Sequence, residues 1–188
     1  MSIVARRLLV TTQVAFPGRT KNMSTAKRLA DVGAATTELI LRPNPSGEFT
    51  DLTCVNMMCE HVGGSCVCKL AKSLSKAPGL ERLDLRGNKL GALPDAVKDL
   101  EKLTYLDVSG NELKELSSIA KLPNLKTLVA DDNKLTRLEL GDMTSLRQIS
   151  LNNNAMTSFP DLSWETLCAF DFKIQLDGNP CHPDNKPE

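Results

Sequence analysis

The sequence predicts an α/β solenoid: a short right-handed arc with a parallel β-sheet on its concave side and irregular, 3₁₀ or helical segments on its convex side. The first observation is an apolar pattern at residues 80–90, which reads L-x-x-L-x-L-x-x-N-x-L. The second is its recurrence, because the asparagines of successive copies, Asn88, Asn111, Asn133 and Asn154, lie 23, 22 and 21 residues apart. A unit of this length buries its apolar face only by stacking on its neighbours.

The L-x-L centre of each copy predicts a short strand. Alternation along a strand directs Leu83 and Leu85 into a shared core and places Arg82, Asp84 and Arg86 on the opposite face. The asparagine follows where the chain turns away from the strand. Because its side chain both donates and accepts hydrogen bonds, we expect stacked asparagines to satisfy backbone groups that the turns would otherwise leave unpaired.

This consensus resembles that of the leucine-rich repeat family, over roughly residues 48–182. Most units resemble short intracellular repeats, and residues 176–180 (Leu-Asp-Gly-Asn-Pro) are similar to the L-x-G-N-P that ends many such arrays. The longer unit before residue 80 resembles the ribonuclease-inhibitor type. The resemblance implies a non-enzymatic protein-binding scaffold that uses its concave sheet and needs no cofactor.

We expect four regions. Residues 1–35 form a basic targeting or disordered segment, 36–79 an N-terminal cap with a degenerate first repeat, 80–160 the regular repeats, and 161–188 a C-terminal cap and tail. In the N-terminal cap, apolar residues at helical spacing predict a helix over 67–76. Residues 36–44 look like a degenerate strand, and residues 49–57 carry apolar residues at repeat positions. The concave face is therefore expected to begin with Asp51, Thr53 and Val55.

In the C-terminal cap, two registers compete for the last strand. One uses Leu167, Phe170 and Phe172, and the other, which we favour, uses Ile174 and leads to Asn179. A terminal repeat must cover the open end of the core. We therefore expect the aromatic residues of this cap to lie over that end, and these are Trp164, Phe170 and Phe172.

Charge is unevenly distributed in this chain of 188 residues with zero formal net charge. Residues 1–30 contain six basic and no acidic residues, which leaves the remainder with a charge of −6. An acidic body argues against nucleic acid as a partner, and no apolar run reaches the length of a membrane span. A basic, acid-free leader is typical of a mitochondrial transit peptide; a disordered arm and a secretory signal are alternatives.

Cys54, Cys59, His61, Cys66 and Cys68 fall within 15 residues. Thiolates and imidazole are ligands that zinc prefers, but the segment lacks the C-x-x-C pair of common zinc motifs. Cys54 also occupies an apolar position, where cysteine packs as a small buried side chain. The sequence therefore favours ordinary structural cysteines and predicts no metal, with a zinc site or a redox-responsive pair as alternatives.

No catalytic motif is present: the sequence lacks phosphate-binding glycine loops and the G-x-S-x-G elbow. His61 and His182 fall in opposite caps, so we expect no shared catalytic site and no enzyme. The leading hypothesis is a protein-interaction scaffold, a subunit or assembly factor of a mitochondrial complex. The alternatives are a cytosolic adaptor that binds a phosphatase, GTPase or cytoskeletal protein, and a zinc-binding or redox-responsive module.

The predicted partner surface is the outward face of the strands, and the alternative is that this face is a plain solvated sheet. Its centre is Tyr105, flanked by Arg82, because tyrosine and arginine are favoured anchors at interfaces. The residues expected to contact a protein partner are Arg82, Asp84, Arg86, Tyr105, Asp107, Thr127, Asp131, Gln148 and Asn152.

Overall fold

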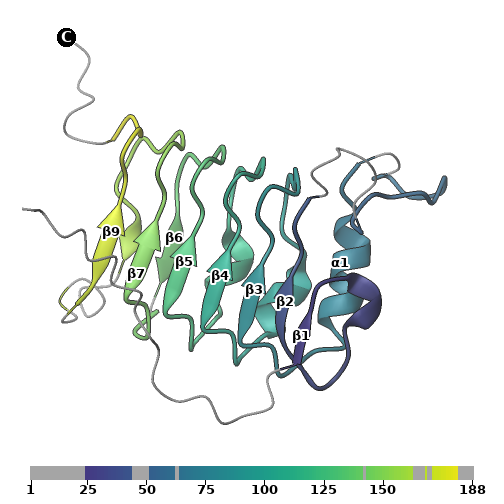
Figure 1. The fold of residues 1–188 in the computed structure, drawn as a ribbon. Helices are drawn as coiled ribbons and strands as arrows, with labels where there is room; N and C mark the ends of the chain where they lie inside the picture. Colours follow the sequence, from purple (N-terminus) through teal and green to yellow (C-terminus); the bar gives the residue numbers. More distant parts are fainter. Residues whose placement is uncertain are drawn as a thin grey trace, which may run out of the picture.

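The computed structural model describes residues 24–43, 51–61, 64–141, 143–162, 168 and 171–181. Within them, seven strands form one parallel sheet in the order β1-β2-β3-β4-β5-β7-β9 (Figure 1). The strands of this sheet are β1 (Ser24–Ala26), β2 (Thr36–Ile40), β3 (Arg82–Asp84), β4 (Tyr105–Asp107), β5 (Thr127–Val129), β7 (Gln148–Ser150) and β9 (Lys173–Gln175).

The regular strands pair without a register shift. Leu83 of β3 lies beside Leu106 of β4, which lies beside Leu128 of β5, and the row continues to Ile149 and Ile174. The predicted repeats are therefore confirmed as stacked units. Ile174 in this row also decides the register of the last strand in favour of the predicted alternative that leads to Asn179.

Short helices and a second strand pair lie on the other side of the core (Figure 1). They are η1 (Leu29–Asp31), α1 (Val67–Leu74), η2 (Asp95–Asp99), η3 (Ser117–Ile119), β6 (Glu139–Gly141) and β8 (Asp161–Leu162). The predicted helix and 3₁₀ turns are confirmed. The 3₁₀ segments are short because repeats of this length leave room for little more than one helical turn. The parallel β6–β8 pair was not predicted. Among the residues described, no helix has the length and apolarity needed to cross a membrane.

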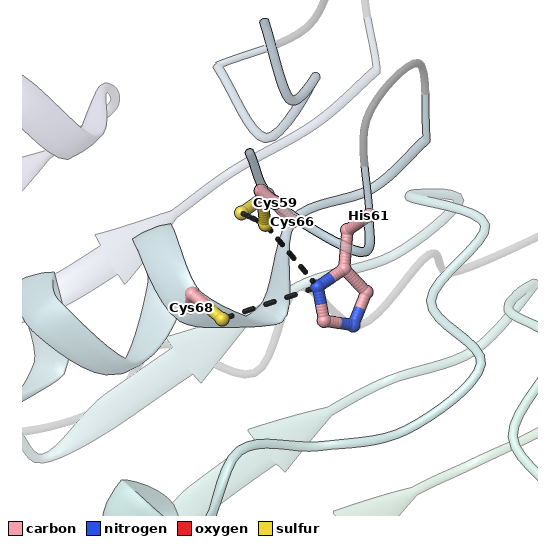
Figure 2. A group of neighbouring side chains, drawn as sticks. All are labelled: Cys59, His61, Cys66 and Cys68. Atoms are coloured by element: carbon pink, nitrogen blue, oxygen red, sulfur yellow. Dashed lines mark hydrogen bonds between the residues drawn. The ribbon is translucent and has the colours of Figure 1, made fainter. Parts of the chain in front are cut away.

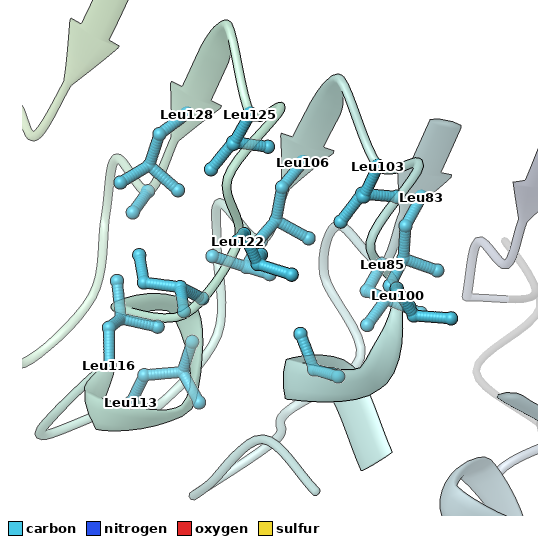
Figure 3. Close-up of a cluster of buried hydrophobic side chains, with 14 of the residues drawn as sticks. Leu83, Leu85, Leu100, Leu103, Leu106, Leu113, Leu116, Leu122, Leu125 and Leu128 are labelled. Atoms are coloured by element: carbon cyan, nitrogen blue, oxygen red, sulfur yellow. The ribbon is translucent and has the colours of Figure 1, made fainter. Parts of the chain in front are cut away.

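Leucines from successive repeats fill a continuous core between these two sides (Figure 3). Leu83, Leu85, Leu106 and Leu128 are fully buried, as expected for inward-facing strand positions. On the helical side, Leu70 and Leu74 of α1 reach the same core because they lie four residues apart on one face. Burial of these side chains by neighbouring units is the main stabilising contribution to the array.

Buried asparagines connect consecutive repeats along one edge of this core. The Asn111 amide donates to the carbonyls of Leu85 (3.0 Å) and Val108 (2.8 Å), and its Oδ1 accepts from the Leu90 N–H (3.0 Å). The equivalent Oδ1 acceptors in the following units are Asn133, Asn154 and Asn179. The predicted role of the stacked asparagines is confirmed.

The folded body begins earlier than expected. Strand β1 and η1 lie inside the segment 1–35 that was predicted to be a targeting or disordered region, and Ala26 and Val32 are buried. The basic side chains of Lys27 and Arg28 therefore belong to the folded cap. Residues 1–23 lie outside the described part of the chain.

The predicted entry strand was also wrong. Strand β3 pairs with β2, in the register Glu38 beside Arg82, and not with the segment containing Asp51, Thr53 and Val55. Thr53 instead forms an isolated antiparallel bridge with Ser65. Both segments contain alternating apolar residues, and alternation does not select the strand with which a segment pairs.

Candidate functional site

The concave face consists of the outward residues of the sheet. In the row nearest the strand starts, Arg82, Tyr105, Thr127 and Gln148 are neighbours, as predicted. Asp84 and Asp107 pair in the next row, and Arg86, Asp131 and Asn152 each lie two residues after the end of their strand. Four further residues belong to this face and were missed, because the entry strand was misplaced and the exit register was uncertain: Glu38, Arg42, Lys173 and Gln175.

Arg82 and Tyr105 form a stacked pair on β3 and β4. The guanidinium carbon of Arg82 lies 3.6 Å from the centroid of the Tyr105 ring, a cation–π contact. The Tyr105 hydroxyl donates to Oδ2 of Asp107 at 3.2 Å. Burial, followed by the negative charge of Asp107, raises the pKa of Tyr105, so the phenol stays protonated near neutral pH and keeps this bond. The pair is therefore held in place before any partner arrives.

Asp84 and Asp107 of this face are buried beneath arginines. The Asp84 side chain is 0% exposed, whereas those of Arg42 and Arg86 are 58% and 42% exposed. Arg42 Nη2 lies 3.1 Å and Arg86 Nη2 3.0 Å from Asp84 Oδ2, and Arg86 Nε lies 3.2 Å from Asp107 Oδ2. The prediction that Asp84 and Asp107 contact a partner is wrong, since the guanidinium groups cover them. Their effect is to orient the arginines that are exposed.

Asp84 contributes to stability in a pH-dependent way. Burial alone would raise the pKa of Asp84, but hydrogen bonds from the side chain and backbone of Arg86, with the charges of Arg86 and Arg42, lower it below its usual value. A carboxyl whose folded-state pKa is depressed stabilises the protein above its unfolded pKa of about 4. That contribution is lost as the pH falls through the lower folded-state pKa.

We therefore expect Asp84→Asn to lower the free energy of unfolding by about 2 kcal/mol at pH 7, the typical contribution of hydrogen bonds to a charged group. The difference from the wild-type protein should shrink as the pH falls below about 4. Urea unfolding at several pH values measures it. Asp99→Asn, at an exposed position of η2, is the matched control and should change stability little. An equal loss at pH 7 in both variants would contradict the prediction.

The C-terminal half of the concave face has different chemistry. Asp131 Oδ1 accepts hydrogen bonds from the Ser150 hydroxyl and from the Asn152 N–H, both at 2.7 Å. Gln148 is exposed and Thr127 is half-buried. The β2–β4 half of the face therefore carries arginines and the single tyrosine, Tyr105, whereas amide and hydroxyl groups predominate at β5–β9, together with the charged side chains of Asp131 and Lys173.

The cysteine–histidine cluster lies away from this face, between the N-terminal cap loop and α1. Ligand atoms of Cys59, His61, Cys66 and Cys68 all lie within 4.8 Å of one another. Cys54 is not part of this group. Burial fits the predicted structural role for Cys54 and Cys66, but Cys68 is exposed and Cys59 is only half-buried. Packing as small apolar side chains therefore does not explain the whole cluster.

The family assignment follows from the in-register sheet, the asparagine ladder and a comparison with family models. The model described as "Leucine rich repeat" matches residues 71–113. The chain therefore has the fold of stacked leucine-rich repeats. The comparisons support a protein–protein interaction scaffold as its general function.

Several curated proteins resemble this leucine-rich repeat protein over part of their length. Tubulin-specific chaperone E of Xenopus laevis is 25% identical over 74% of this chain and 28% of its own length. The human U2 small nuclear ribonucleoprotein A' is 31% identical over 43% of this chain and 32% of its own. Lumican of Rattus norvegicus is 35% identical over 49% and 28%. The chain thus spans about a third or less of each relative.

Among solved structures, an internalin C2 from Listeria monocytogenes is 20% identical and covers 82% of this leucine-rich repeat protein and 76% of its own chain, with a TM-score of 0.47. An internalin from the same organism covers 76% of this chain with a TM-score of 0.45. The fold assignment does not depend on these likenesses, because the sheet register and the asparagine ladder already establish the repeats.

Proposed function

We propose that this leucine-rich repeat protein is a non-enzymatic subunit or assembly factor of a larger complex, and that it binds its protein partner through the concave face. The observation that carries the proposal is the Arg82–Tyr105 stack, which lies half-buried on the middle of the sheet. Arginine and tyrosine dominate binding energy at many interfaces, and a side chain that is already held in place loses less entropy on binding. Asp84 and Asp107 provide that support for Arg86 and Tyr105.

We further propose that the complex is mitochondrial. The support is the composition of residues 1–23, which carry four basic residues, Arg6, Arg7, Arg19 and Lys21, and no acidic residue. A cleavable leader would have to end before β1, since Ala26 is buried in the cap. The test is the N-terminal sequence and location of the endogenous protein. A chain that begins at Met1 and resides in the cytosol contradicts this part and favours the cytosolic adaptor.

The binding proposal is tested by co-purification from mitochondrial and cytosolic fractions with a C-terminally tagged full chain. We expect the wild-type protein to migrate within an assembly larger than its own mass of 20.5 kDa. The double variant Arg82→Ala/Tyr105→Ala should recover at least about tenfold less of the same partner, because anchor residues contribute about 2 kcal/mol or more when truncated.

The matched control removes an arginine and an aromatic side chain elsewhere. Arg137 and Phe159 are both exposed, and they lie beside the separate β6–β8 pair and not on the concave sheet. Arg137→Ala/Phe159→Ala should leave partner recovery unchanged. Equal recovery by the two double variants would show that the concave anchor is wrong, even if a complex forms.

A further inference from the structure

The cluster in the N-terminal cap brings three thiols and one imidazole together from two segments of the chain. Cys59 and His61 lie in the loop that precedes α1, Cys66 is the residue that caps α1, and Cys68 lies in its first turn (Figure 2). We propose that Cys59, His61, Cys66 and Cys68 bind one zinc ion as a structural Cys₃His site. This assignment is independent of the concave face and its partner.

Three of the six distances between the ligand atoms are close to those of tetrahedral zinc, and all six are within 4.8 Å. Zn–S bonds of about 2.3 Å and Zn–N bonds of about 2.0–2.1 Å place neighbouring ligands about 3.8 Å apart for two sulfurs and about 3.6 Å apart for sulfur and nitrogen. The Cys59 and Cys66 sulfurs are separated by 3.9 Å, and His61 Nδ1 lies 3.6 Å from the Cys59 sulfur and 3.9 Å from that of Cys68. A thiol is only a weak hydrogen-bond donor, so hydrogen bonding alone gives little reason for four such groups to converge.

The orientation of His61 agrees with a ligand role. Its Nδ1 points to the sulfurs of Cys59 and Cys68 (Figure 2). The second ring nitrogen, Nε2, lies 3.9 Å from the exposed Glu60 carboxylate, which is beyond hydrogen-bond distance. Four protein ligands complete the preferred coordination of zinc and leave no open position for substrate, so the site is structural and not catalytic.

The described residues of the loop provide no apolar anchor. Val55, Met57 and Met58 are exposed, at 71%, 84% and 93%, and no described residue from 55 to 65 belongs to the hydrophobic core. The loop base is held by two backbone bonds, Cys54 N–H to Gly64 O (2.9 Å) and Cys66 N–H to Leu52 O (2.7 Å). Zinc would join the loop to α1, and its binding free energy would stabilise the folded loop in place of buried apolar side chains.

The proposed site is coupled to the first regular repeat. The Ser65 hydroxyl, next to Cys66, donates a hydrogen bond to the backbone carbonyl of Asn88. Lys69 of α1 also donates to the Thr53 carbonyl at 2.6 Å. Zinc binding would thus fix the loop against both α1 and the start of the repeat array.

The test measures zinc in the full chain purified under reducing conditions, by elemental analysis and by the tetrahedral cobalt–thiolate spectrum after exchange with Co²⁺. We expect about one zinc per chain in the wild-type protein. His61→Ala and Cys68→Ser should lower the zinc content at least about fivefold, whereas His61→Cys, which supplies a fourth thiolate, should retain it. Cys54→Ala and Cys181→Ser are the matched cysteine controls and should retain it too.

Hydrogen exchange provides a second measurement that does not depend on the variants folding. Chelation of zinc from the wild-type protein should speed exchange at the Cys54 and Cys66 amides and leave the Leu128 amide in β5 unchanged. The proposal would be overturned if the reduced wild-type protein contained no zinc, or if a Cys59–Cys66 disulfide formed in place of the metal. It would also be overturned if Cys54→Ala lost as much zinc as Cys68→Ser.

Discussion

Replacement of Leu106 by alanine is expected to lower the free energy of unfolding by about 3 kcal/mol. Leu106 lies in β4 at the centre of the array, is fully buried, and has Leu83 and Leu128 beside it in the neighbouring strands. Truncation of its side chain leaves a cavity in the core, next to Leu83 of the preceding repeat and Leu128 of the following repeat. In a solenoid whose stability is a sum of neighbour interfaces, a central site weakens two interfaces at once.

Urea unfolding of the full chain, followed by circular dichroism, measures this loss as a lower midpoint with an unchanged slope. Leu93→Ala is the matched control. Leu93 packs against the same core but is only partly buried, so its truncation should have the smaller effect. A loss at Leu106 no larger than that at Leu93 would contradict the argument that β4 occupies the centre of the core.

Asn111→Ala is expected to destabilise the protein by a similar amount, about 3 kcal/mol, although asparagine is polar and small. The substitution leaves the buried Leu90 N–H without its acceptor and removes the amide that links the carbonyls of Leu85 and Val108. Those two carbonyls keep one asparagine each, Asn88 and Asn133, so the cost comes mainly from the unsatisfied N–H and the lost link between units.

The control for Asn111 is Asn124, which is exposed and donates to the Glu101 carbonyl at 2.8 Å. Asn124→Ala should cost less than about 1 kcal/mol, because water replaces the lost partner. Chemical denaturation of the two variants under the same conditions distinguishes the roles. If both lose equal stability, the ladder is not the source of the effect at Asn111.

Most of the array could be predicted because its information is local and repeated. Each unit contains its inward-facing leucines and its turn asparagine within about a dozen residues. When the units stack, this pattern permits only one register between neighbouring strands. This explains why Leu83, Leu106 and Leu128 were placed correctly. The entry strand failed for the opposite reason: β2 and residues 51–55 satisfy the same short pattern, and only packing against β3 decides between them.

At the two candidate sites, the sequence determined which residue types were available, and the tertiary structure decided what they do. The alternation of side chains along the strand placed Asp84 on the concave face. In the structure, however, Arg42 and Arg86 cover Asp84, and Arg42 lies 42 residues away from it in the sequence. Cys59 and His61 meet Cys66 and Cys68 because the loop folds back onto α1. Local periodicity fixes the direction in which a side chain points, whereas burial and ligand geometry depend on segments that meet only when the chain is folded.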